Sequence, residues 1–449
     1  MPTQRLKIHF IGIGGIGVSA LAKYYLKKGN EVSGSDLVSS EITQALKKMG
    51  AKIFIGKHKP ENIPDKVNLV IYSPAVNFSN PELEKAINEG SVSFRKVLSY
   101  PQALGELTKE YFTIAVSGTH GKSTTTAMLG LLLIKAGFDP TIILGTKLKE
   151  IGNSNCRVGK SKYLVIEADE HFASFLNYWP KIIVLTTIEK DHLDYYKNLK
   201  NILKAFQKYI GRLDREGFLI INKDDKNIKR LKIKNHPIYY SLKQKEASRL
   251  GEILKVPGKH NVYNALAALS VARVLKIPDK ISFKALSEYT HSWRRFEIHK
   301  VRFNRKGITL ISDYGHHPTE VKVTLKAARE KYPKKKIFCV FQPHQYQRTY
   351  YLFKDFVNVL KRVPVDEMIV TDIYDVAGRE EKSIKRKVSA EKLVRAVKKK
   401  QVVYISKKGI LNHLKKHLKE GDILIVMGAG DIYDLTLHLT TGKIRKKIY

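Results

Sequence analysis

The sequence predicts an α/β protein of three domains, each built on a sheet of mostly parallel strands. Short apolar runs, typical of buried parallel strands, alternate with helical segments along the whole chain. Two glycine turns, at residues 12–17 and 118–121, each join a strand to a helix. At 449 residues and about 150 residues per domain, three domains are within expectation. We expect them to cover 1–108, 109–292 and 293–449.

The composition is strongly basic, with 81 lysines and arginines against 42 acidic residues and a net charge of +39. Nucleic-acid binding is one interpretation of such a charge. The lysines are scattered in short runs such as 334–336 and 398–400, and the chain has no motif that combines basic and aromatic residues. A solvated basic surface is therefore favoured, and we expect no nucleic-acid partner. The charge should still attract anionic substrates over a distance.

Cysteines and hydropathy indicate a cytoplasmic enzyme. Cys156 and Cys339 lie far apart and match no metal-binding spacing, so they are interpreted as incidental thiols in a reducing compartment. No apolar run reaches the roughly 18 residues of a membrane span. The first apolar run is rich in glycine and leads into a fold motif, so no signal peptide and no membrane span are expected.

The first domain begins with a strand, Lys7 to Ile11, followed by the turn Gly12-Ile13-Gly14-Gly15-Ile16-Gly17 and a helix from about Ile16 to Lys28. Asp36 ends the next strand, about 20 positions further on. A GxGxxG turn that opens a helix places backbone N–H groups against a diphosphate, and an acidic residue at this distance can contact a ribose. By itself the motif does not separate a dinucleotide from another diphosphate ligand. Ser73 follows a later strand, at the edge where open α/β sheets place their ligands.

The central domain begins with a strand from Phe112 to Val116, the turn 117–121, Lys122-Ser123, and a helix that runs from Ser123 to Leu133. This layout predicts a cradle for a nucleotide triphosphate. Lys122 would reach the β- and γ-phosphates, and the Ser123 hydroxyl would hold Mg²⁺. The usual phosphate-loop pattern has a glycine where Val116 stands.

Polar residues follow the next two strands of the central domain. Glu167 comes after the run 163–166, and His192 comes after the run 182–185. A carboxylate and an imidazole at neighbouring strand ends, close to a phosphate loop, are candidates for a second divalent metal. Asn264 lies in the first turn of a helix from Val262 to Lys276.

The third domain repeats the alternation of strands and helices. Its expected strands end at polar segments that contain Asp313, His316 and His317, then His344, then Gly428 to Asp431. Neighbouring histidines on a loop rarely converge on one ion, so we favour substrate or phosphate contact over metal binding for His316 and His317. At the domain boundary, one arginine of Arg294-Arg295 could reach a phosphate as the domains close.

Taken together, the motifs resemble those of the Mur ligase family, over nearly the whole chain. The matching segments are GIGGIG, GTHGKSTTT, EADE, DHLDYY, KHNVYNALAA, RRFE, DYGHHPTE, FQPH and GAGD. The resemblance implies a Rossmann-like N-terminal domain for a UDP substrate, a central ATPase domain with a phosphate loop, and a Rossmann-like C-terminal domain that closes over the site. Three family positions differ: Thr187 replaces asparagine, Ser312 replaces aspartate, and Gln345 replaces arginine. Phe206 stands where some relatives have a carbamylated lysine.

The resemblance also implies roles for individual residues. The UDP substrate would be bound by Gly14, Gly15, Ile16, Gly17, Asp36, Ser73, His316 and His317. ATP would be bound by Gly118, Thr119, His120, Gly121, Lys122, Ser123, Thr124, Asn264, Arg295 and Asp313. The metal ligands would be Ser123, Glu167 and His192, the last two for a second Mg²⁺. The catalytic set would be Lys122, His192, Arg295, His344 and Arg348.

The implied reaction is an ATP-dependent amide formation in peptidoglycan synthesis. The motifs are most similar to those of the member that joins L-alanine to the lactyl carboxylate of UDP-N-acetylmuramate through an acyl phosphate. A recycling ligase that adds a whole tripeptide is the alternative within the family. A dinucleotide-dependent oxidoreductase would leave residues 118–123 without a role, and a basic nucleic-acid-dependent ATPase is a third class. The expected partners are UDP-N-acetylmuramate, L-alanine and ATP, and the expected state is a monomer or homodimer.

Overall fold

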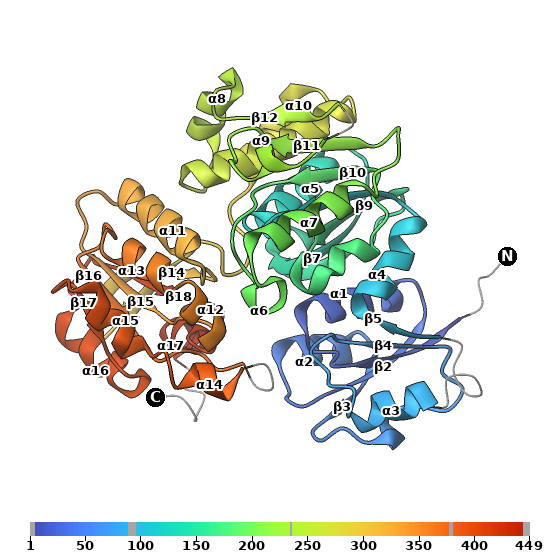
Figure 1. The fold of residues 1–449 in the computed structure, drawn as a ribbon, viewed down its shortest axis with the longest axis horizontal. Coiled ribbons are helices and arrows are strands. Elements are labelled where there is room, and N and C mark those ends of the chain that lie inside the picture. Colours follow the sequence, from blue (N-terminus) through green and yellow to red (C-terminus); the bar gives the residue numbers. More distant parts are fainter. Residues whose placement is uncertain (1–4, 89–95, 234–235, 377–379, 443–449) are drawn as a thin grey trace. The chain divides into compact units, whose positions relative to one another are not determined.

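The computed structural model describes residues 5–88, 96–233, 236–376 and 380–442. These residues form three sheets flanked by helices (Figure 1), which confirms the predicted α/β class. The chain divides into two compact units. The first unit spans 1–188, 203–242 and 264–286, and the second unit spans 189–202, 243–263 and 287–449.

The N-terminal sheet belongs to the first unit and has the strand order β3-β2-β1-β4-β5, with every pair parallel. Its strands are β1 (Lys7–Ile11), β2 (Glu31–Asp36), β3 (Lys52–Ile55), β4 (Leu69–Tyr72) and β5 (Lys96–Ser99). Its helices are α1 (Ile16–Lys27), α2 (Glu41–Lys48), α3 (Pro81–Asn88) and α4 (Tyr100–Lys109). Strand β1 is central, and Phe10 and Ile11 are completely buried. This explains why the strand is an almost continuous apolar run.

The central sheet also belongs to the first unit and has the order β12-β11-β10-β6-β9-β7-β8. All its pairs are parallel except β7 with β8. The strands are β6 (Phe112–Ser117), β7 (Thr141–Leu148), β8 (Ser154–Arg157), β9 (Tyr163–Ala168), β10 (Ile182–Leu185), β11 (Phe218–Asn222) and β12 (Ile238–Tyr240). Ser117 pairs with Ala168 on one side and with Leu185 on the other. The phosphate-loop segment and the polar residues after β9 therefore leave the sheet at the same edge.

The helices of this central stretch are α5 (Lys122–Lys135), α6 (Leu193–Tyr196), α7 (Leu199–Ile210), α8 (Lys245–Ile253), α9 (Lys259–Val274) and α10 (Asp279–Glu288). Short 3-10 helices are η1 (Pro60–Asn62), η2 (Lys149–Ile151), η3 (His171–Asn177) and η4 (Ile228–Arg230). Helix α5 packs on β6, β7 and β9. It starts at Lys122, one residue earlier than predicted.

Helix α1 of the N-terminal sheet packs against β7 and β8 of the central sheet. Asn155 of β8 lies at the centre of this contact and is 1% exposed. Its side-chain amide donates to the Ile16 carbonyl at 2.6 Å and to Ser19 Oγ at 3.0 Å, and it accepts from Lys23 Nζ at 2.7 Å. These hydrogen bonds fix the first turn of α1 on the central sheet.

The second unit contains the third sheet, with the order β13-β14-β18-β15-β16-β17. Its pairs are parallel except β13 with β14. The strands are β13 (Glu297–Phe303), β14 (Lys306–Asp313), β15 (Ile337–Phe341), β16 (Glu367–Val370), β17 (Val402–Tyr404) and β18 (Ile423–Met427). The helices are α11 (Pro318–Lys331), α12 (Tyr346–Tyr351), α13 (Phe353–Leu360), α14 (Lys382–Lys385), α15 (Ala390–Val397), α16 (Lys407–His417) and α17 (Tyr433–Thr441).

The third sheet is buried on both faces, by two separate apolar clusters. Asp313 and Phe341 both pair with Met427. The polar segments that follow β14, β15 and β18 therefore start at one edge of the sheet. This is the edge where the sequence predicts the site residues of the third domain. The domain limits at 108 and 292 remain a prediction.

In the described part of the chain, we find no helix with the length and apolar character needed to cross a membrane. Both cysteines are completely buried, and burial raises the pKa of the Cys156 thiol to about 12. At neutral pH this thiol is therefore protonated and packs as an apolar group.

Candidate active site

The predicted UDP-substrate residues of the first unit meet at the carboxyl end of β1. Gly12 has a φ of +77°, and a Cβ there would lie 3.0 Å from Ser73 Cβ, so glycine is required. The Gly14 N–H donates to Asp36 Oδ2 at 2.8 Å, and a Cβ on Gly14 would collide with that same oxygen. Asp36 thus holds the turn in shape. It was predicted to contact the substrate, which remains a prediction.

The N-terminus of α1 is suited to an anion. Its N-cap is Gly15, which has no side chain to accept from the first-turn N–H groups. The N–H groups of Ile16 and Gly17 begin the helix, where the helix dipole also favours negative charge. The turn and helix thus form a possible diphosphate site.

The phosphate-loop segment between β6 and α5 depends on two glycines. Gly118 has a φ of +133°, and a Cβ there would lie 2.1 Å from Thr186 Oγ1. Gly121 has a φ of +84°, and its Cβ would lie 2.4 Å from Asn264 Oδ1. No other residue fits either position. Gly121 is also the N-cap of α5, so the N–H groups of that first turn face no capping side chain.

The neighbouring strand end holds the first part of the loop. The Thr119 N–H donates to the Thr187 carbonyl at 2.8 Å, and the His120 N–H donates to Thr187 Oγ1 at 3.1 Å. Thr187 is one of the positions where this chain differs from the family pattern, and its hydroxyl supplies an acceptor there. Asn264 Oδ1 accepts from Thr125 Oγ1 at 3.2 Å, so Asn264 lies beside the start of α5. Its predicted contact with ATP remains a prediction.

Lys122 lies over the loop among carboxylates. Its Nζ donates to the Gly118 carbonyl at 2.7 Å and to Glu170 Oε2 at 2.8 Å, and it lies 3.8 Å from Asp169 Oδ1. Burial alone would lower the pKa of Lys122, but Glu170 and Asp169 outweigh it and raise that pKa above its ordinary value. Lys122 is therefore a permanent cation. Burial also raises the pKa of Glu170, to about 7.

Ser123 and Glu167 are brought together by the structure. The Ser123 hydroxyl donates to Glu167 Oε2 at 2.9 Å, and the Gly145 N–H donates to Glu167 Oε1 at 2.6 Å. A hydroxyl oxygen and a carboxylate oxygen at this separation are suitable ligands for Mg²⁺, which prefers oxygen donors. The residues present therefore fit a divalent cation. The third predicted ligand, His192, belongs to the second unit.

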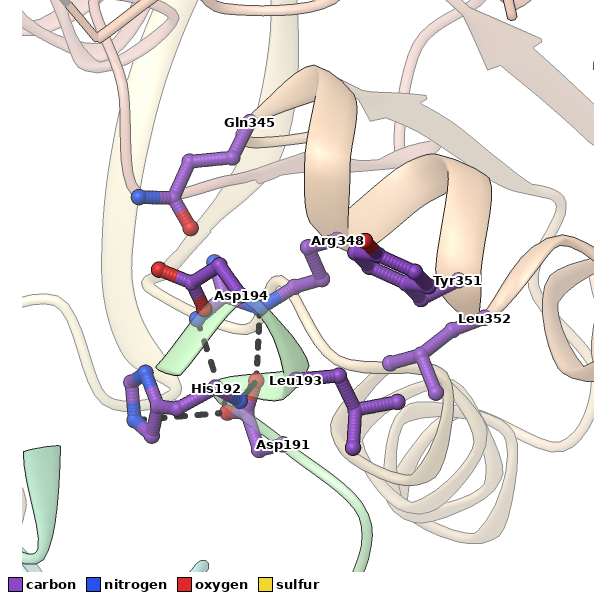
Figure 2. A pocket seen from close by; sticks show the side chains of 8 residues that line it. All are labelled: Asp191, His192, Leu193, Asp194, Gln345, Arg348, Tyr351 and Leu352. Atoms are coloured by element: carbon purple, nitrogen blue, oxygen red, sulfur yellow. Dashed lines mark hydrogen bonds and ion pairs between the residues drawn. The ribbon is translucent and has the colours of Figure 1, made fainter. Parts of the chain in front are cut away.

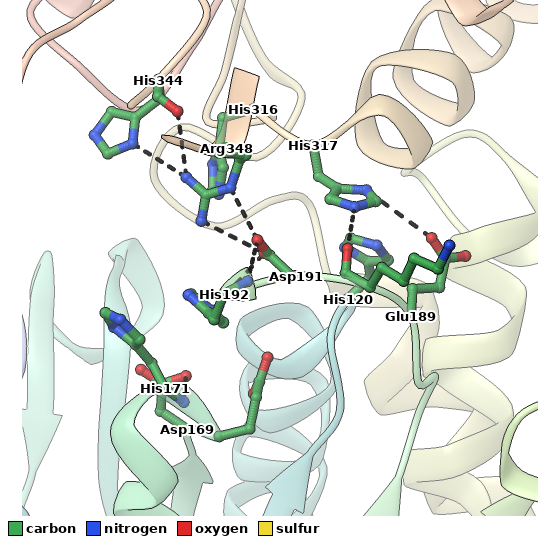
Figure 3. A network of polar contacts seen from close by, with 12 residues as sticks. His120, Asp169, His171, Glu189, Asp191, His192, His316, His317, His344 and Arg348 are labelled. Carbon is green, nitrogen blue, oxygen red and sulfur yellow. Dashed lines mark hydrogen bonds and ion pairs between the residues drawn. The ribbon is translucent and has the colours of Figure 1, made fainter. Parts of the chain in front are cut away.

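In the second unit, the predicted residues gather around a buried ion pair. Arg348 Nε donates to Asp191 Oδ1 at 2.9 Å, and Arg348 Nη1 lies 3.3 Å from His344 Nδ1 (Figure 3). Burial by itself raises the pKa of Asp191, but Arg348 and then His192 outweigh it and hold that pKa well below its ordinary value. Asp191 is thus an anion.

His192 and Arg348 also line a small pocket with Gln345 (Figure 2). Its space is about 10 Å³, roughly that of one water molecule. Gln345 is the position where the family has arginine. Here its side chain contributes an amide and no charge to the pocket wall.

His344 and His316 are held neutral. Burial lowers the pKa of His316 to about 4. The pKa of His344 is lowered to about 2, mainly by burial and to a smaller extent by His316 and Arg348. The His344 ring stacks on Tyr374, with centroids 5.3 Å apart, and its Nδ1 accepts from Arg348. Each ring can therefore exchange hydrogen bonds with a substrate without adding charge.

His317 and Asp313 are engaged by the protein itself. His317 caps α11: its Nδ1 accepts from the Thr319 N–H at 3.2 Å, and its Nε2 donates to the Lys190 carbonyl at 3.0 Å. Asp313 accepts from the N–H groups of Gly315 and Phe296, at 2.8 and 2.9 Å. The structure gives both residues a positioning role. Their predicted contacts with substrate and ATP remain predictions.

The two arginines at the start of the third domain differ in environment. Arg294 is 6% exposed, lies over the rings of Tyr433 and Tyr314, and donates to the Gly428 carbonyl. Arg295 is more exposed, lies over Tyr314, and is 3.9 Å from Glu320. Arg295, the predicted ATP contact, is the one of the pair that a ligand can reach.

Phe206, where some relatives have a carbamylated lysine, is a core residue. It is completely buried and packs edge-on against Phe175, with ring centroids 5.1 Å apart. Sequence reasoning did not assign two other residues that contact predicted ones, Glu170 beside Lys122 and Asp191 beside Arg348. Both lie inside the quoted segments EADE and DHLDYY, so the motifs themselves were the available signal.

Comparisons with known proteins agree with the geometry. Three family models match: "Mur ligase family, catalytic domain" at residues 7–112, "Mur ligase middle domain" at 116–272, and "Mur ligase, glutamate ligase domain" at 294–430. The chain is 40% identical to a UDP-N-acetylmuramate–L-alanine ligase of Aquifex aeolicus, over 95% of both chains. It is 42% identical to the protein of that name from Clostridium tetani, over 95% of this chain and 96% of the other. The structure of UDP-N-acetylmuramate-alanine ligase MurC from Thermotoga maritima aligns with a TM-score of 0.77 and 29% identity, over 95% of this chain and 96% of that one.

Proposed function

The chain belongs to the Mur ligase family, and on that premise we propose that it joins L-alanine to the lactyl carboxylate of UDP-N-acetylmuramate at the expense of ATP. The observation that carries the proposal is the cluster at the N-terminus of α5. There, Lys122 lies over the loop at 2.7 Å from the Gly118 carbonyl, and Ser123 lies 2.9 Å from Glu167. The relatives at about 40% identity bear the name of this activity.

The proposed reaction has two steps. The lactyl carboxylate attacks the γ-phosphorus of ATP, which gives an acyl phosphate and ADP. The free amine of L-alanine then attacks the acyl carbon, an amide bond forms, and phosphate leaves. Activation is needed because a carboxylate has no usable leaving group.

Residues of this chain would act mainly by positioning and by charge. The first-turn N–H groups of α5 would bind the triphosphate, and Lys122 would offset charge on the transferred phosphoryl group. Ser123 and Glu167 would hold Mg²⁺, which supplies further charge neutralisation when bound. In the second unit, His344 and Arg348 would contact the amino-acid substrate or the acyl phosphate. Arg348 supplies the positive charge and His344 a neutral ring.

The defining assay uses purified protein, ATP, Mg²⁺ and UDP-N-acetylmuramate. L-alanine, glycine, L-serine and the tripeptide are offered separately. We expect ADP release only with the muramate nucleotide, and fastest with L-alanine. Turnover with the tripeptide alone would instead support the recycling ligase. ADP release that is stimulated by DNA or RNA and independent of the muramate nucleotide would assign the protein to another class.

The role of the loop is tested with Lys122→Ala. We expect this variant to lose turnover and to retain UDP-N-acetylmuramate binding, because the UDP site is on another sheet. Lys135→Ala is the matched control, since Lys135 is an exposed lysine in the last turn of the same helix. Loss of UDP-N-acetylmuramate binding in Lys122→Ala would mean that the two nucleotide sites have been exchanged in our assignment.

A further inference from the structure

Tyr100, the first residue of α4, lies against the helix of the predicted diphosphate site. A Cβ on Gly17, in the first turn of α1, would lie 2.9 Å from Tyr100 Cζ and 3.0 Å from its hydroxyl oxygen. The absence of a side chain at Gly17 therefore leaves room for the Tyr100 ring. This contact fixes the phenol beside the first turn of α1.

The Tyr100 hydroxyl is also affected by the carboxylates beside the proposed ATP site. Burial, then the charges of Glu167 and Asp169, raise the pKa of Tyr100 above its ordinary value. Glu167 is the carboxylate that contacts Ser123 at the start of α5. The phenol is therefore protonated at neutral pH, beside Gly17 and close enough to Glu167 to be affected by its charge.

Within the part of the chain that the structure describes, the Tyr100 hydroxyl has no hydrogen-bond partner, and the side chain is only half-buried. Two other tyrosines of this unit differ, although the buried Tyr209 hydroxyl also lacks a partner among the described residues. Tyr24 shares a hydrogen bond with Tyr111 at 3.0 Å, and Tyr240 donates to the Leu185 carbonyl at 3.0 Å. A phenol normally finds a partner when the protein alone determines its position. The Tyr100 hydroxyl is thus available to a ligand.

We propose that Tyr100 is a substrate-contact residue, whose hydroxyl donates a hydrogen bond to an oxygen of the N-acetylmuramoyl group. This rests on the proposed function, in which that group spans the distance from the diphosphate to the carboxylate that is phosphorylated. Its ring and ether oxygens, its acetamido carbonyl and its carboxylate are all acceptors. UDP alone lacks this part of the substrate, so a contact with the N-acetylmuramoyl group affects only the binding of the complete nucleotide.

The test is Tyr100→Phe in the full chain, which removes one oxygen and keeps the ring against Gly17. A neutral hydrogen bond contributes about 0.5–1.5 kcal/mol, which corresponds to roughly a 2- to 12-fold change. We expect kcat/KM for UDP-N-acetylmuramate to fall by about that factor. The dissociation constant of UDP and the urea midpoint should stay at their wild-type values. A purely structural role would leave kcat/KM unchanged.

Tyr24→Phe is the matched control, because it removes the hydroxyl of a tyrosine in α1 itself, which bonds to Tyr111. It should lower the urea midpoint, since a protein hydrogen bond is lost, and leave kcat/KM unchanged. Two results would overturn the inference: wild-type kcat/KM in Tyr100→Phe, or equal weakening of UDP and UDP-N-acetylmuramate binding. The proposed function has a separate test in the wild-type protein. If the wild type shows no ADP release that depends on the muramate nucleotide, the proposed function fails, whatever the result with Tyr100→Phe.

Discussion

The ion pair between Arg348 and Asp191 makes a quantitative prediction for Arg348→Met. The two side chains are 8% and 7% exposed, and the guanidinium approaches the two carboxylate oxygens at 2.9 and 3.5 Å. Removing one partner of a buried pair leaves the other charge uncompensated, at a cost of about 3–5 kcal/mol. We therefore expect Arg348→Met to lower the free energy of unfolding of the second unit by roughly 3 kcal/mol at neutral pH.

The two tryptophans of the chain allow this unit to be followed separately. Trp179 is in the first unit and 45% exposed, while Trp293 is in the second unit and donates to the Tyr433 hydroxyl at 2.8 Å. In a Trp179→Phe background, urea unfolding monitored by tryptophan fluorescence reports on Trp293 alone. Lys326→Met is the control, because Lys326 forms an exposed pair with Glu330 at 4.0 Å. That variant should change stability by less than about 0.5 kcal/mol.

The pH dependence gives an independent check of the same pair. Arg348 helps to hold the pKa of Asp191 well below its ordinary value. The resulting stabilisation is fully present above the unfolded-state pKa of about 3.9 and disappears as the pH falls through the lower folded-state pKa. The difference between wild type and Arg348→Met should therefore be constant near neutrality and shrink in strong acid. A loss below about 1 kcal/mol, or full additivity with Asp191→Asn, would refute the reasoning.

Two further predictions concern the loop and the buried histidines. Gly121→Ala should raise the KM for ATP about tenfold or more, because the new Cβ would lie 2.4 Å from Asn264 Oδ1. Gly137→Ala is the control, because Gly137 has a similar φ of +80° and open space around it, and this variant should leave the KM for ATP unchanged. An unchanged KM in Gly121→Ala would show that the loop tolerates the displacement. Burial lowers the pKa values of His260 and His316 to about 4, so the unfolded chain takes up protons between pH 6.5 and 4 that the folded chain does not. The free energy of unfolding should therefore decrease as the pH is lowered from 6.5 to 4, by up to roughly 3 kcal/mol per histidine. In His260→Gln, urea unfolding should show a weaker dependence of this free energy on pH. The same pH dependence as in the wild type would contradict the assignment.

Sequence patterns predicted the fold because the strands of parallel sheets are local, continuous apolar runs. The run Phe112–Val116 was expected to be a strand and forms β6, with one added residue. The predicted class and the family membership are both confirmed. The glycine turns were also found locally, because each requires a special backbone geometry within a few residues.

The remaining site residues depend on contacts between distant parts of the chain. Asp191 acquires its low pKa from Arg348, 157 positions away in the sequence. Tyr100 meets Gly17 only because α4 packs against α1. Single-sequence patterns contain no information on such pairings. The sequence predicted Ser123 as a ligand of one Mg²⁺ and Glu167 as a ligand of a second, but it did not reveal that the two side chains share a hydrogen bond.

The charge of the whole chain and the charge of the proposed ATP site have opposite signs. The net charge is +39, yet Lys122 is surrounded by Glu167, Asp169 and Glu170, all of which raise its pKa. A triphosphate therefore meets a surplus of carboxylates. The lysines of the surface do not compensate for this locally, since exposed charges are screened beyond about 8 Å at physiological ionic strength. We therefore propose that the basic surface speeds the approach of anionic substrates, and that a divalent cation offsets the carboxylates when ATP binds at the proposed site.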